Sequence, residues 1–456
     1  MDQLPNLGRE PEMLKIIGLD SIDELFSDIP SEVRFPGKLP LRNPQSEEEI
    51  LRDARMLLGA NVTSKNKISF LGAGLYRNFV PSLVGQLIGR GEFLTAYTPY
   101  QPEVSQGMLQ AMWEFQTMIS ELTGLPISNV SVYDGSTAVA EAITCSVRVH
   151  NKKATQKDTV YVSELIPPHR YSVIENYTQG GGINIKKLKH DDNGLIDLDD
   201  LSNANGSCAV YVEQPNPIGI LDGGITKIKE IIGDSTALIV GVQPTSLGVL
   251  EAPGNYGADI VVGEGQPLGV GITGGGPIYG IFACSKKYLR QMPGRIVGKS
   301  VDDRDQTAFC LTLSTREQHI RRHRATSNLC TNETLIALMG AMHMSLLGPK
   351  GIEKLALRNF AARQLLEEKI SEIDGVVIPY SESNHYNEFV IRLPMNAQKA
   401  LDWLDDNGII GGIALSNWYS GRENDLLICA TDQTTLHEIE TFKLKLEELL
   451  RGFNDE

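Results

Sequence analysis

The chain has 456 residues, of which 41% are hydrophobic and 22% are charged. These proportions are close to the soluble globular average, and they exclude a disordered chain, a collagen and a coiled coil as descriptions of the whole. Its 42 basic and 57 acidic residues give a net charge of −15, which disfavours proteins that bind nucleic acid or anionic membranes through a basic surface.

The cysteine pattern and the first residues indicate a cytoplasmic protein. Six cysteines lie far apart with no CxxC pair, as expected for reduced thiols in the cytosol. The segment Met1–Glu12 is polar and lacks the apolar region of a signal peptide. The longest apolar stretches have the length of strands and are too short to span a bilayer.

Residues 1–65 are predicted to form an N-terminal helical arm. Ser46 and Glu49 have the spacing of a capping box. Apolar residues then recur at helical spacing, namely Ile50, Leu51, Ala54, Leu57 and Leu58. Two shorter helices are expected over Pro11–Ile16 and Ser21–Phe26.

Residues 66–330 are predicted to form a large α/β domain. The strand candidates are Val130–Tyr133, Thr159–Val162, Ile183–Ile185, Cys208–Glu213, Ala237–Val242, Asp259–Val262 and Tyr279–Ala283. Helices are expected over Gln106–Leu122, from Ser136 onward, and over Arg170–Tyr177. Continuous apolar runs are typical of strands buried on both faces of a parallel sheet, so helices should cover both faces.

Residues 331–456 are predicted to form a smaller C-terminal α/β domain. Helices over Asn332–Leu347 and Lys350–Ile373 should be separated at Gly348. Strands and helices then alternate: strands at Glu388–Arg392, Gly408–Ile413 and Leu426–Ala430, helices at Ala397–Leu404 and Leu436–Leu450.

Two motif matches are better explained without a cofactor or a metal. Gly269–Gly274 matches GxGxxG, but more glycine, Pro277 and an apolar strand follow where a dinucleotide site needs a helix. We interpret it as an irregular loop. His319 and His323 have metal-ligand spacing on an expected helix, but neighbouring arginines oppose a cation and no HExxH glutamate is present.

The same basic run is a candidate binding surface. Arg316, Arg321 and Arg322 lie in a nine-residue segment that ends at Arg324. Its simplest explanation is a solvated helix face, and its functional interpretation is a surface that attracts a carboxylate or an acidic partner.

A second candidate for anion binding follows a predicted strand. Asp134 precedes Gly135, Ser136 and Thr137, where a helix is expected to begin. Free backbone N–H groups at a helix N-terminus suit a phosphate, and the two hydroxyls would add donors. A plain helix cap is the alternative, so the segment predicts either a cap or a real or vestigial phosphate site.

The densest polar and aromatic cluster is a proline-containing loop between Glu92 and Glu103. Its candidate site residues are Tyr97, Thr98, Tyr100, Gln101 and Glu103. Two prolines prevent a regular helix, so the loop is expected to be extended and fixed. Rigid loops with hydroxyl, amide and carboxylate groups are common at functional sites, although tyrosines that pack on a neighbour would explain the cluster as well.

Several motifs together resemble one family. They are Phe70–Tyr76, Thr95–Gly107, Tyr133–Ala138, Val262–Gly269 and Ala325–Asn332. In this order they resemble subunit 1, the alpha or N-terminal-half subunit, of the glycine cleavage system P-proteins, which are glycine dehydrogenases (decarboxylating). The resemblance covers nearly the whole chain, and the Thr95–Gly107 loop is highly specific.

The resemblance implies a fold and a reaction. The fold is that of the fold-type-I pyridoxal-phosphate (PLP) transferases, with a mainly parallel sheet in the large domain. The reaction decarboxylates glycine and passes its aminomethyl group to the lipoyl arm of the H-protein. PLP serves as the electron sink once a lysine holds it as a Schiff base, and an acidic residue keeps its pyridine nitrogen protonated.

Neither of these two requirements is met in the expected place. No lysine occurs between Lys229 and Lys286, an interval that contains Asp259–Pro267, where the fold places the Schiff-base lysine. The expected pyridine-binding carboxylate is replaced by Gln243. The resemblance implies that subunit 2 carries the cofactor and that this chain has no Schiff-base lysine.

We therefore expect one half of an enzyme, inactive alone. The Tyr97–Glu103 residues are expected to reach the cofactor pocket of subunit 2, and Arg316, Arg321 and Arg322 to attract the lipoylated H-protein or order the subunit interface. The resemblance implies an α2β2 complex that acts on glycine, with the T- and L-proteins as indirect partners.

Three alternatives are left open by the sequence. A self-sufficient PLP enzyme would use Lys286 or Lys287, which should begin a helix after the strand. A purely structural or regulatory subunit would contribute nothing to the partner's site. A nicotinamide dehydrogenase rests on the glycine-rich loop alone.

Overall fold

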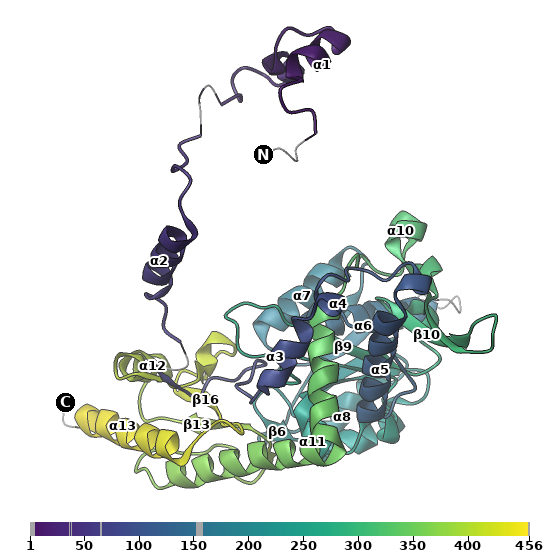
Figure 1. The fold of residues 1–456 in the computed structure, drawn as a ribbon. Helices are drawn as coiled ribbons and strands as arrows, with labels where there is room; N and C mark the ends of the chain where they lie inside the picture. Colours follow the sequence, from purple (N-terminus) through teal and green to yellow (C-terminus); the bar gives the residue numbers. More distant parts are fainter. Residues whose placement is uncertain (1–4, 36, 38, 64–65, 152–157, 455–456) are drawn as a thin grey trace. The chain divides into compact units, whose positions relative to one another are not determined.

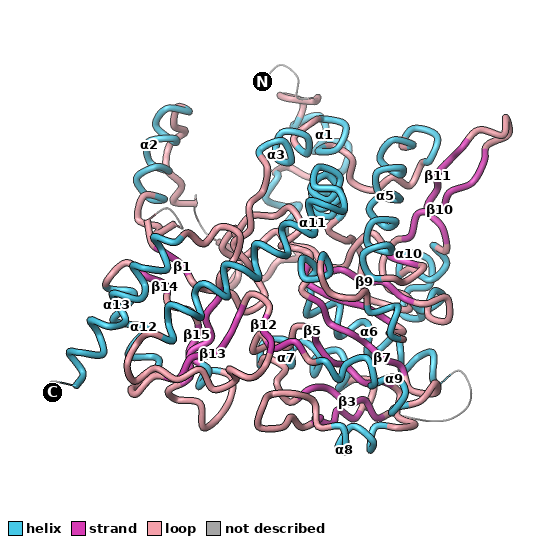
Figure 2. Tube along the Cα trace, turned by 90° about the horizontal axis from the view of Figure 1, so that it is seen from below, coloured by secondary structure: helices cyan, strands magenta, loops and turns pink. Residues whose placement is uncertain are grey.

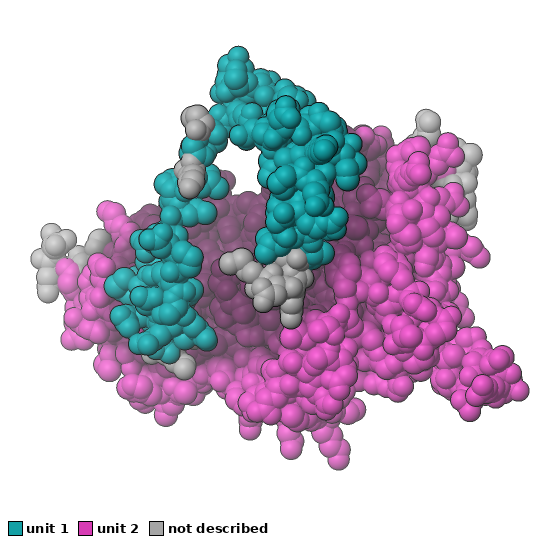
Figure 3. Space-filling model, turned by 45° about the horizontal axis from the view of Figure 1, so that its top comes forward, with its two compact units in different colours: residues 1–62 teal, residues 63–456 magenta. Residues whose placement is uncertain are grey.

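A computed structural model describes residues 5–454 except 36, 38, 64–65 and 152–157, and no side chain is described after residue 452. The chain divides into two compact units, residues 1–62 and 63–456, which Figure 3 colours separately.

The described residues of the first unit form three helices and no buried core. They are α1 (Glu10–Ile17), the 3₁₀ helix η1 (Ile22–Phe26) and α2 (Glu47–Leu58). The predicted capping box is confirmed, because the Ser46 hydroxyl accepts from the Glu49 amide and the Glu49 carboxylate accepts from the Ser46 amide. None of the described residues of this unit is buried.

A seven-stranded sheet forms the centre of the second unit. In spatial order its strands are β2 (Ile127–Ser128), β9 (Gly280–Cys284), β8 (Ile260–Glu264), β7 (Ala237–Val242), β5 (Ala209–Gln214), β3 (Thr159–Ser163) and β4 (Asn184–Leu188). The five from β8 to β4 are parallel, whereas β9 and β2 are antiparallel to their neighbours. The predicted mainly parallel sheet is confirmed.

Alternating residues of these strands enter two separate cores. In β7, Leu238 and Val240 pack in the core that contains α5 (Gln106–Thr123), and Ile239 packs in the core that contains α6 (Gly135–Asn151). Both sets of side chains are fully buried. This explains why the strands read as continuous apolar runs rather than as an alternating pattern.

Further elements surround the sheet (Figure 1). The helices are α3 (Ser82–Ile88), α4 (Gly91–Leu94), α7 (Pro168–Gln179), α8 (Leu198–Leu201), α9 (Ile228–Ile232) and α10 (Gln318–Arg321). The 3₁₀ helices are η2 (Pro102–Val104), η3 (Ser202–Ala204), η4 (Gly223–Lys227), η5 (Pro244–Gly248), η6 (Pro253–Tyr256), η7 (Leu289–Gln291), η8 (Ser314–Arg316) and η9 (Arg322–Arg324). A hairpin of β10 (Ile296–Val301) and β11 (Thr307–Thr312), which the sequence did not predict, extends away from the sheet in Figure 2.

The C-terminal part builds a smaller lobe with its own apolar core. Its strands are β13 (Glu388–Arg392), β16 (Asp425–Cys429) and β15 (Ile413–Ala414), with β1 (Ile68–Ser69) paired to β14 (Ile409–Ile410) and β6 (Ile220–Leu221) paired to β12 (Asn384–His385). Its helices are α12 (Ala397–Asp406), α13 (Leu436–Asn454) and η10 (Leu415–Asn417).

Helix α11 (Thr334–Ser371) joins the two lobes and bends sharply in Figure 1. The bend lies at Gly348, whose φ of 61° and ψ of 178° are not helical, as the predicted break between two helices required. By length and composition α11 is apolar enough to cross a membrane. Its break and its buried residues, such as Leu338 and Leu366 in the two lobe cores, identify it as a core helix.

Several predicted elements differ from the structure. The edge strand is β2, and Val132 of the predicted strand forms only a single bridge with Gly280. The predicted strand Gly408–Ile413 is divided into β14 and β15. Between them, Gly412 has a φ of 116°, which is not a strand conformation, and the close Leu427 carbonyl leaves no room for a side chain there. The helix expected through His319 and His323 ends at Arg321, so the two histidines do not share a helix.

Candidate functional site

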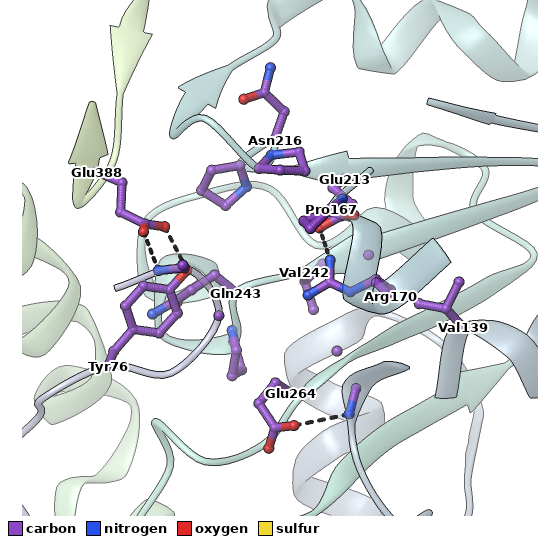
Figure 4. A pocket seen from close by; sticks show the side chains of 18 of the residues that line it. Tyr76, Val139, Pro167, Arg170, Glu213, Asn216, Val242, Gln243, Glu264 and Glu388 are labelled. Atoms are coloured by element: carbon purple, nitrogen blue, oxygen red, sulfur yellow. Dashed lines mark hydrogen bonds and ion pairs between the residues drawn. The ribbon is translucent and has the colours of Figure 1, made fainter. Parts of the chain in front are cut away.

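A small cleft lies at the carboxyl ends of the parallel strands β5, β7 and β8 (Figure 4). The beginnings of α6 and α7, the loop before Tyr76, and Glu388 of β13 complete its wall. In open α/β sheets this edge is where ligands bind, because the strand order reverses there and leaves a crevice. The cleft has a volume of about 50 Å³.

A buried ion pair crosses the cleft. The Arg170 guanidinium of α7 donates a hydrogen bond to the Glu213 carboxylate near the end of β5. The two side chains are 13% and 10% exposed. Burial lowers the pKa of Arg170, but the nearby Glu213 and Tyr211 outweigh it and the net shift is upward, so the arginine stays charged. The pair therefore fills the cleft with two opposite charges.

Glu388 brings the small lobe into the same cleft. One carboxylate oxygen accepts from the Ala73 amide at 2.6 Å, and the other accepts from the Tyr76 hydroxyl at 2.7 Å. Burial raises the pKa of Glu388 to about 7, although both hydrogen bonds favour the charged form. The carboxylate thus ties β13 to the segment that precedes α3.

Glu264 occupies the N-terminus of α6, where the sequence predicted either a plain cap or a phosphate site. Its carboxylate accepts from the Gly135 amide at 2.9 Å and from the Gln266 amide at 3.0 Å. Burial raises its pKa to about 7. Asp134 accepts from the Thr137 amide at 2.6 Å, as in an ordinary cap. The Gly135 and Thr137 amides therefore already have acceptors in the chain itself, and an external phosphate at Gly135, Ser136 and Thr137 would have to displace Glu264.

Gln243 lies at the end of β7 and caps η5. Its side-chain oxygen accepts from the Ser246 amide at 2.9 Å and from the Thr245 hydroxyl at 2.8 Å. Its amide nitrogen is buried without a partner. The position predicted for a pyridine-binding carboxylate thus holds a neutral amide that supports a turn.

None of the described residues that line the cleft is a lysine. Lys229 donates to the Asp259 carboxylate at 2.7 Å, away from the lining. Lys286 and Lys287 lie in an exposed turn after β9, not in the helix that the sequence predicted. Neither lines the cleft, so the geometry does not favour a self-sufficient PLP enzyme that uses one of them.

The tyrosine–proline loop forms an exposed surface elsewhere on the same unit. Tyr97 is 73% exposed, and its hydroxyl lies 2.7 Å from that of Thr331. Tyr100 is 56% exposed, and its hydroxyl accepts from Arg295 at 3.2 Å. The His319 ring packs edge-on against Tyr100 with ring centres 5.7 Å apart. The structure therefore brings the loop together with the segment that follows β11.

The other loop candidates have different environments. Gln101 and Glu103 are exposed, and Glu103 lies within η2. The Thr98 hydroxyl is buried without a partner. The loop does not line the cleft, so any role that it has lies at the outer surface.

The three candidate arginines separate into two kinds, and one expectation needs correction. Arg316 is buried, and its guanidinium donates to the carbonyls of Met292, Leu313 and Gly294. Arg316 was expected to attract a partner at the surface, but its guanidinium N–H groups instead bond backbone carbonyls inside the chain. Arg321 and Arg322 are exposed.

Sequence reasoning missed the residues that fill the cleft and one that supports the loop. Arg170, Glu213, Glu264 and Glu388 fill the cleft. Arg295 is 4% exposed and joins Tyr100 to Asn332 and to the Cys330 carbonyl. The detectable signals were acidic residues near the ends of apolar strands: Glu213 is the residue before the last in β5, and Glu264 is the last residue of β8.

Solved structures of low sequence identity share the fold. A NifS-like protein matches with a TM-score of 0.61 at 14% identity, covering 84% of this chain and 99% of that chain. The alanine–glyoxylate aminotransferase of Nostoc sp. matches with a TM-score of 0.58 at 14% identity, covering 91% and 97%. With its mainly parallel sheet and smaller lobe, the chain has the fold of the fold-type-I PLP-dependent enzymes.

Within that class the chain belongs to the glycine cleavage system P-protein family, whose profile matches residues 5–445. It is 44% identical over 442 residues to the probable glycine dehydrogenase (decarboxylating) subunit 1 of Oceanobacillus iheyensis, covering 96% of each chain. The protein of the same name from Thermococcus onnurineus is 43% identical over 453 residues, covering 98% of this chain and 99% of the relative. A crystal structure of glycine decarboxylase (P-protein) of the glycine cleavage system, in inhibitor-bound form, matches with a TM-score of 0.87 at 37% identity, covering 98% and 100%. The resemblance inferred from the motifs is confirmed.

The cleft of this chain does not fit PLP. Ligand sites typically enclose about 300–1,000 Å³, whereas this cleft offers about 50 Å³. No lysine lines it among the described residues, and Gln243 supplies no carboxylate. The Glu264 carboxylate takes the helix N-terminus that a phosphate would need.

Proposed function

We propose that this chain is subunit 1 of a two-chain glycine decarboxylase, in which subunit 2 binds PLP and this chain completes its active site. The observation that supports this most strongly is the filled cleft, with Glu264 at the N-terminus of α6 and no lysine lining it among the described residues. The relatives named subunit 1 support a heteromeric arrangement. We place the complex in the cytoplasm, as an α2β2 assembly.

In this proposal, the chain contributes a surface rather than a cofactor. Tyr97, Thr98, Tyr100, Gln101 and Glu103 form or support a fixed loop, and its exposed members would border the glycine site and the lipoyl entrance of subunit 2. The hydroxyls would hold substrate by hydrogen bonds and help to exclude water. Arg321 and Arg322 would attract the lipoylated H-protein, and the T- and L-proteins would act only on its later forms.

Mixing the two chains tests the proposal. Glycine-dependent CO₂ release and the visible absorbance of bound PLP are measured for each chain alone and for both together. We expect cofactor absorbance only in samples that contain subunit 2, and full activity only with both chains. Activity from this chain alone, or a cofactor band in it that borohydride removes, would overturn the assignment.

Loss of the Tyr100 hydroxyl should lower the activity of the complex. Tyr100→Phe removes a hydrogen bond from a charged arginine, and such bonds contribute about 1.5–3 kcal/mol. We expect glycine decarboxylation to fall about tenfold or more, which corresponds to about 1.4 kcal/mol. Tyr97→Phe should have the same direction of effect. The measurement is CO₂ release by the assembled complex, with assembly followed by size-exclusion chromatography.

Tyr171→Phe is the matched control, since Tyr171 is a partly exposed tyrosine of α7 outside the loop.

A purely structural or regulatory subunit is the second candidate function, and it is favoured by the hydrogen bonds that both loop tyrosines make within the chain. It predicts that loop variants lose activity only in proportion to lost assembly. Unchanged activity in both loop variants would rule out the active-site role.

A further inference from the structure

We propose that the large lobe has a binding site for a compact polyanion, lined by arginines and separate from the filled cleft. The cavity lies between the end of α6, η7 and residues 313–326, and its volume is about 320 Å³. Five arginines line it: Arg148, Arg290, Arg316, Arg321 and Arg324. Such a concentration of positive charge is unexpected in a chain with a net charge of −15.

The positive charge of this cavity is poorly neutralised by the protein. None of the described residues that line it is acidic. Within the described part of the chain, Arg148 alone of the five has a carboxylate within 4.0 Å, that of Glu141 at 3.8 Å. The next acidic neighbour, Glu317, lies 3.7 Å from His319, and its charge also acts on Arg316.

The arginines of the lining contribute in two ways. Arg316 is held rigidly by backbone carbonyls, so it supplies a fixed charge near the wall. Arg290, Arg321 and Arg324 are exposed, and Arg321 also donates through Nε to the Thr315 carbonyl at 3.1 Å. Guanidinium groups bind phosphate and carboxylate oxygens through paired hydrogen bonds. The hydroxyls of Thr315 and Thr326 and the amide of Gln291 add uncharged donors to the lining.

The size and charge indicate the class of ligand. A volume of about 320 Å³ falls at the small end of ligand sites. Several arginines around one small space favour a ligand with two or more charges, such as a pyrophosphate group or a tricarboxylate. The strongly acidic chain disfavours a nucleic acid, which would need an extended basic face.

The site is connected to the tyrosine–proline loop through α10. Arg321 belongs to α10, and so does His319, whose ring packs on Tyr100. A bound polyanion would hold α10 and η9 in place and would thereby support one side of Tyr100. The site is thus positioned to couple the level of a small anion to the surface that we assign to the partner.

Isothermal titration with inorganic pyrophosphate tests the proposal. The full chain is titrated alone and mixed with subunit 2. The salt concentration is about 0.15 M, because exposed charges are then screened over about 8 Å. We expect one pyrophosphate per chain in both samples, with citrate competing if any compact polyanion suffices. Arg290→Ser combined with Arg324→Ser should weaken binding at least tenfold. Arg322→Ser is the matched control, because Arg322 is an exposed arginine of the same segment that does not line the cavity.

Each other outcome counts against the site. No binding, or equal losses in the lining and control variants, would show general electrostatic attraction only. Binding by the free chain that disappears on mixing with subunit 2 would show that the cavity belongs to a protein interface. Circular dichroism of each variant establishes that it folds. None of these outcomes depends on the decarboxylase activity, so this test and that of the proposed function can fail separately.

Discussion

Replacing Arg170 with methionine should destabilise the protein by roughly 3–5 kcal/mol, because it leaves the Glu213 charge buried without a partner. The pair is largely enclosed, with side chains 13% and 10% exposed, and fills the cleft. The free energy of unfolding, measured in urea on the purified full-length chain, should fall accordingly. The Glu213→Gln variant should be destabilised as well, since Arg170 then lacks its counter-charge.

The double variant Arg170→Met/Glu213→Leu distinguishes charge from packing. Well-packed apolar replacements of a buried ion pair are often neutral, so the double variant should recover much of the loss. Lys369→Met, in an exposed pair with Glu372, is the control and should have little effect. A loss of less than about 1 kcal/mol in Arg170→Met would show that water reaches the cleft and solvates the remaining carboxylate.

The stability of the protein should depend on the ionisation of Glu388. Its pKa is raised to about 7 in the folded protein, whereas an unfolded glutamate titrates near about 4.3. Between these values the folded state binds more protons than the unfolded state, so this group stabilises the fold at low pH and loses that contribution as pH rises toward 7. The integrated effect is on the order of 4 kcal/mol, at 1.36 kcal/mol for each unit of pKa shift.

The Glu388→Gln variant should lack this dependence. The amide oxygen can accept from the Ala73 amide, and the Tyr76 hydroxyl can accept from the new amide nitrogen. The difference in unfolding free energy between variant and wild type should shift in favour of the variant by up to about 3 kcal/mol between about pH 5 and pH 8. Using the difference removes the contribution of the other titrating groups.

Glu264→Gln should act in the same direction, because the pKa of Glu264 is also raised to about 7. Glu382→Gln is the control, since Glu382 is exposed near the same strand. A difference between Glu388→Gln and wild type that stays constant with pH would mean that Glu388 remains charged throughout this range.

The elements that the sequence predicted well depend on local patterns. Strand β7 has the predicted bounds, Ala237–Val242, because its apolar run can only be a strand buried on both faces. The break at Gly348 was predictable because Pro349 follows it and cannot donate within a helix. The predicted irregular loop at Gly269–Gly274 is confirmed, since no helix begins inside the motif.

The filling of the cleft could not be predicted, because its contacts join distant parts of the chain. Glu388 bonds Tyr76, which lies 312 residues earlier. Arg170 and Glu213 meet only because β5 pairs with β3 in the sheet. The burial of Arg316 was hidden for another reason: its partners are backbone carbonyls, which leave no trace in the pattern of side chains.

The hydrogen bonds that the hydroxyls of Tyr97 and Tyr100 make within this chain affect how the chain associates with subunit 2. Tyr97 and Tyr100 stand out from the surface, yet each hydroxyl already has a partner. A side chain that must be immobilised on association costs about 0.5–1.5 kcal/mol in rotational entropy. In the proposed complex this cost is met during folding of the isolated chain, so the surface can dock without rearrangement. Substitutions at Arg295 that release Tyr100 would then weaken association with subunit 2 even though Arg295 itself is buried.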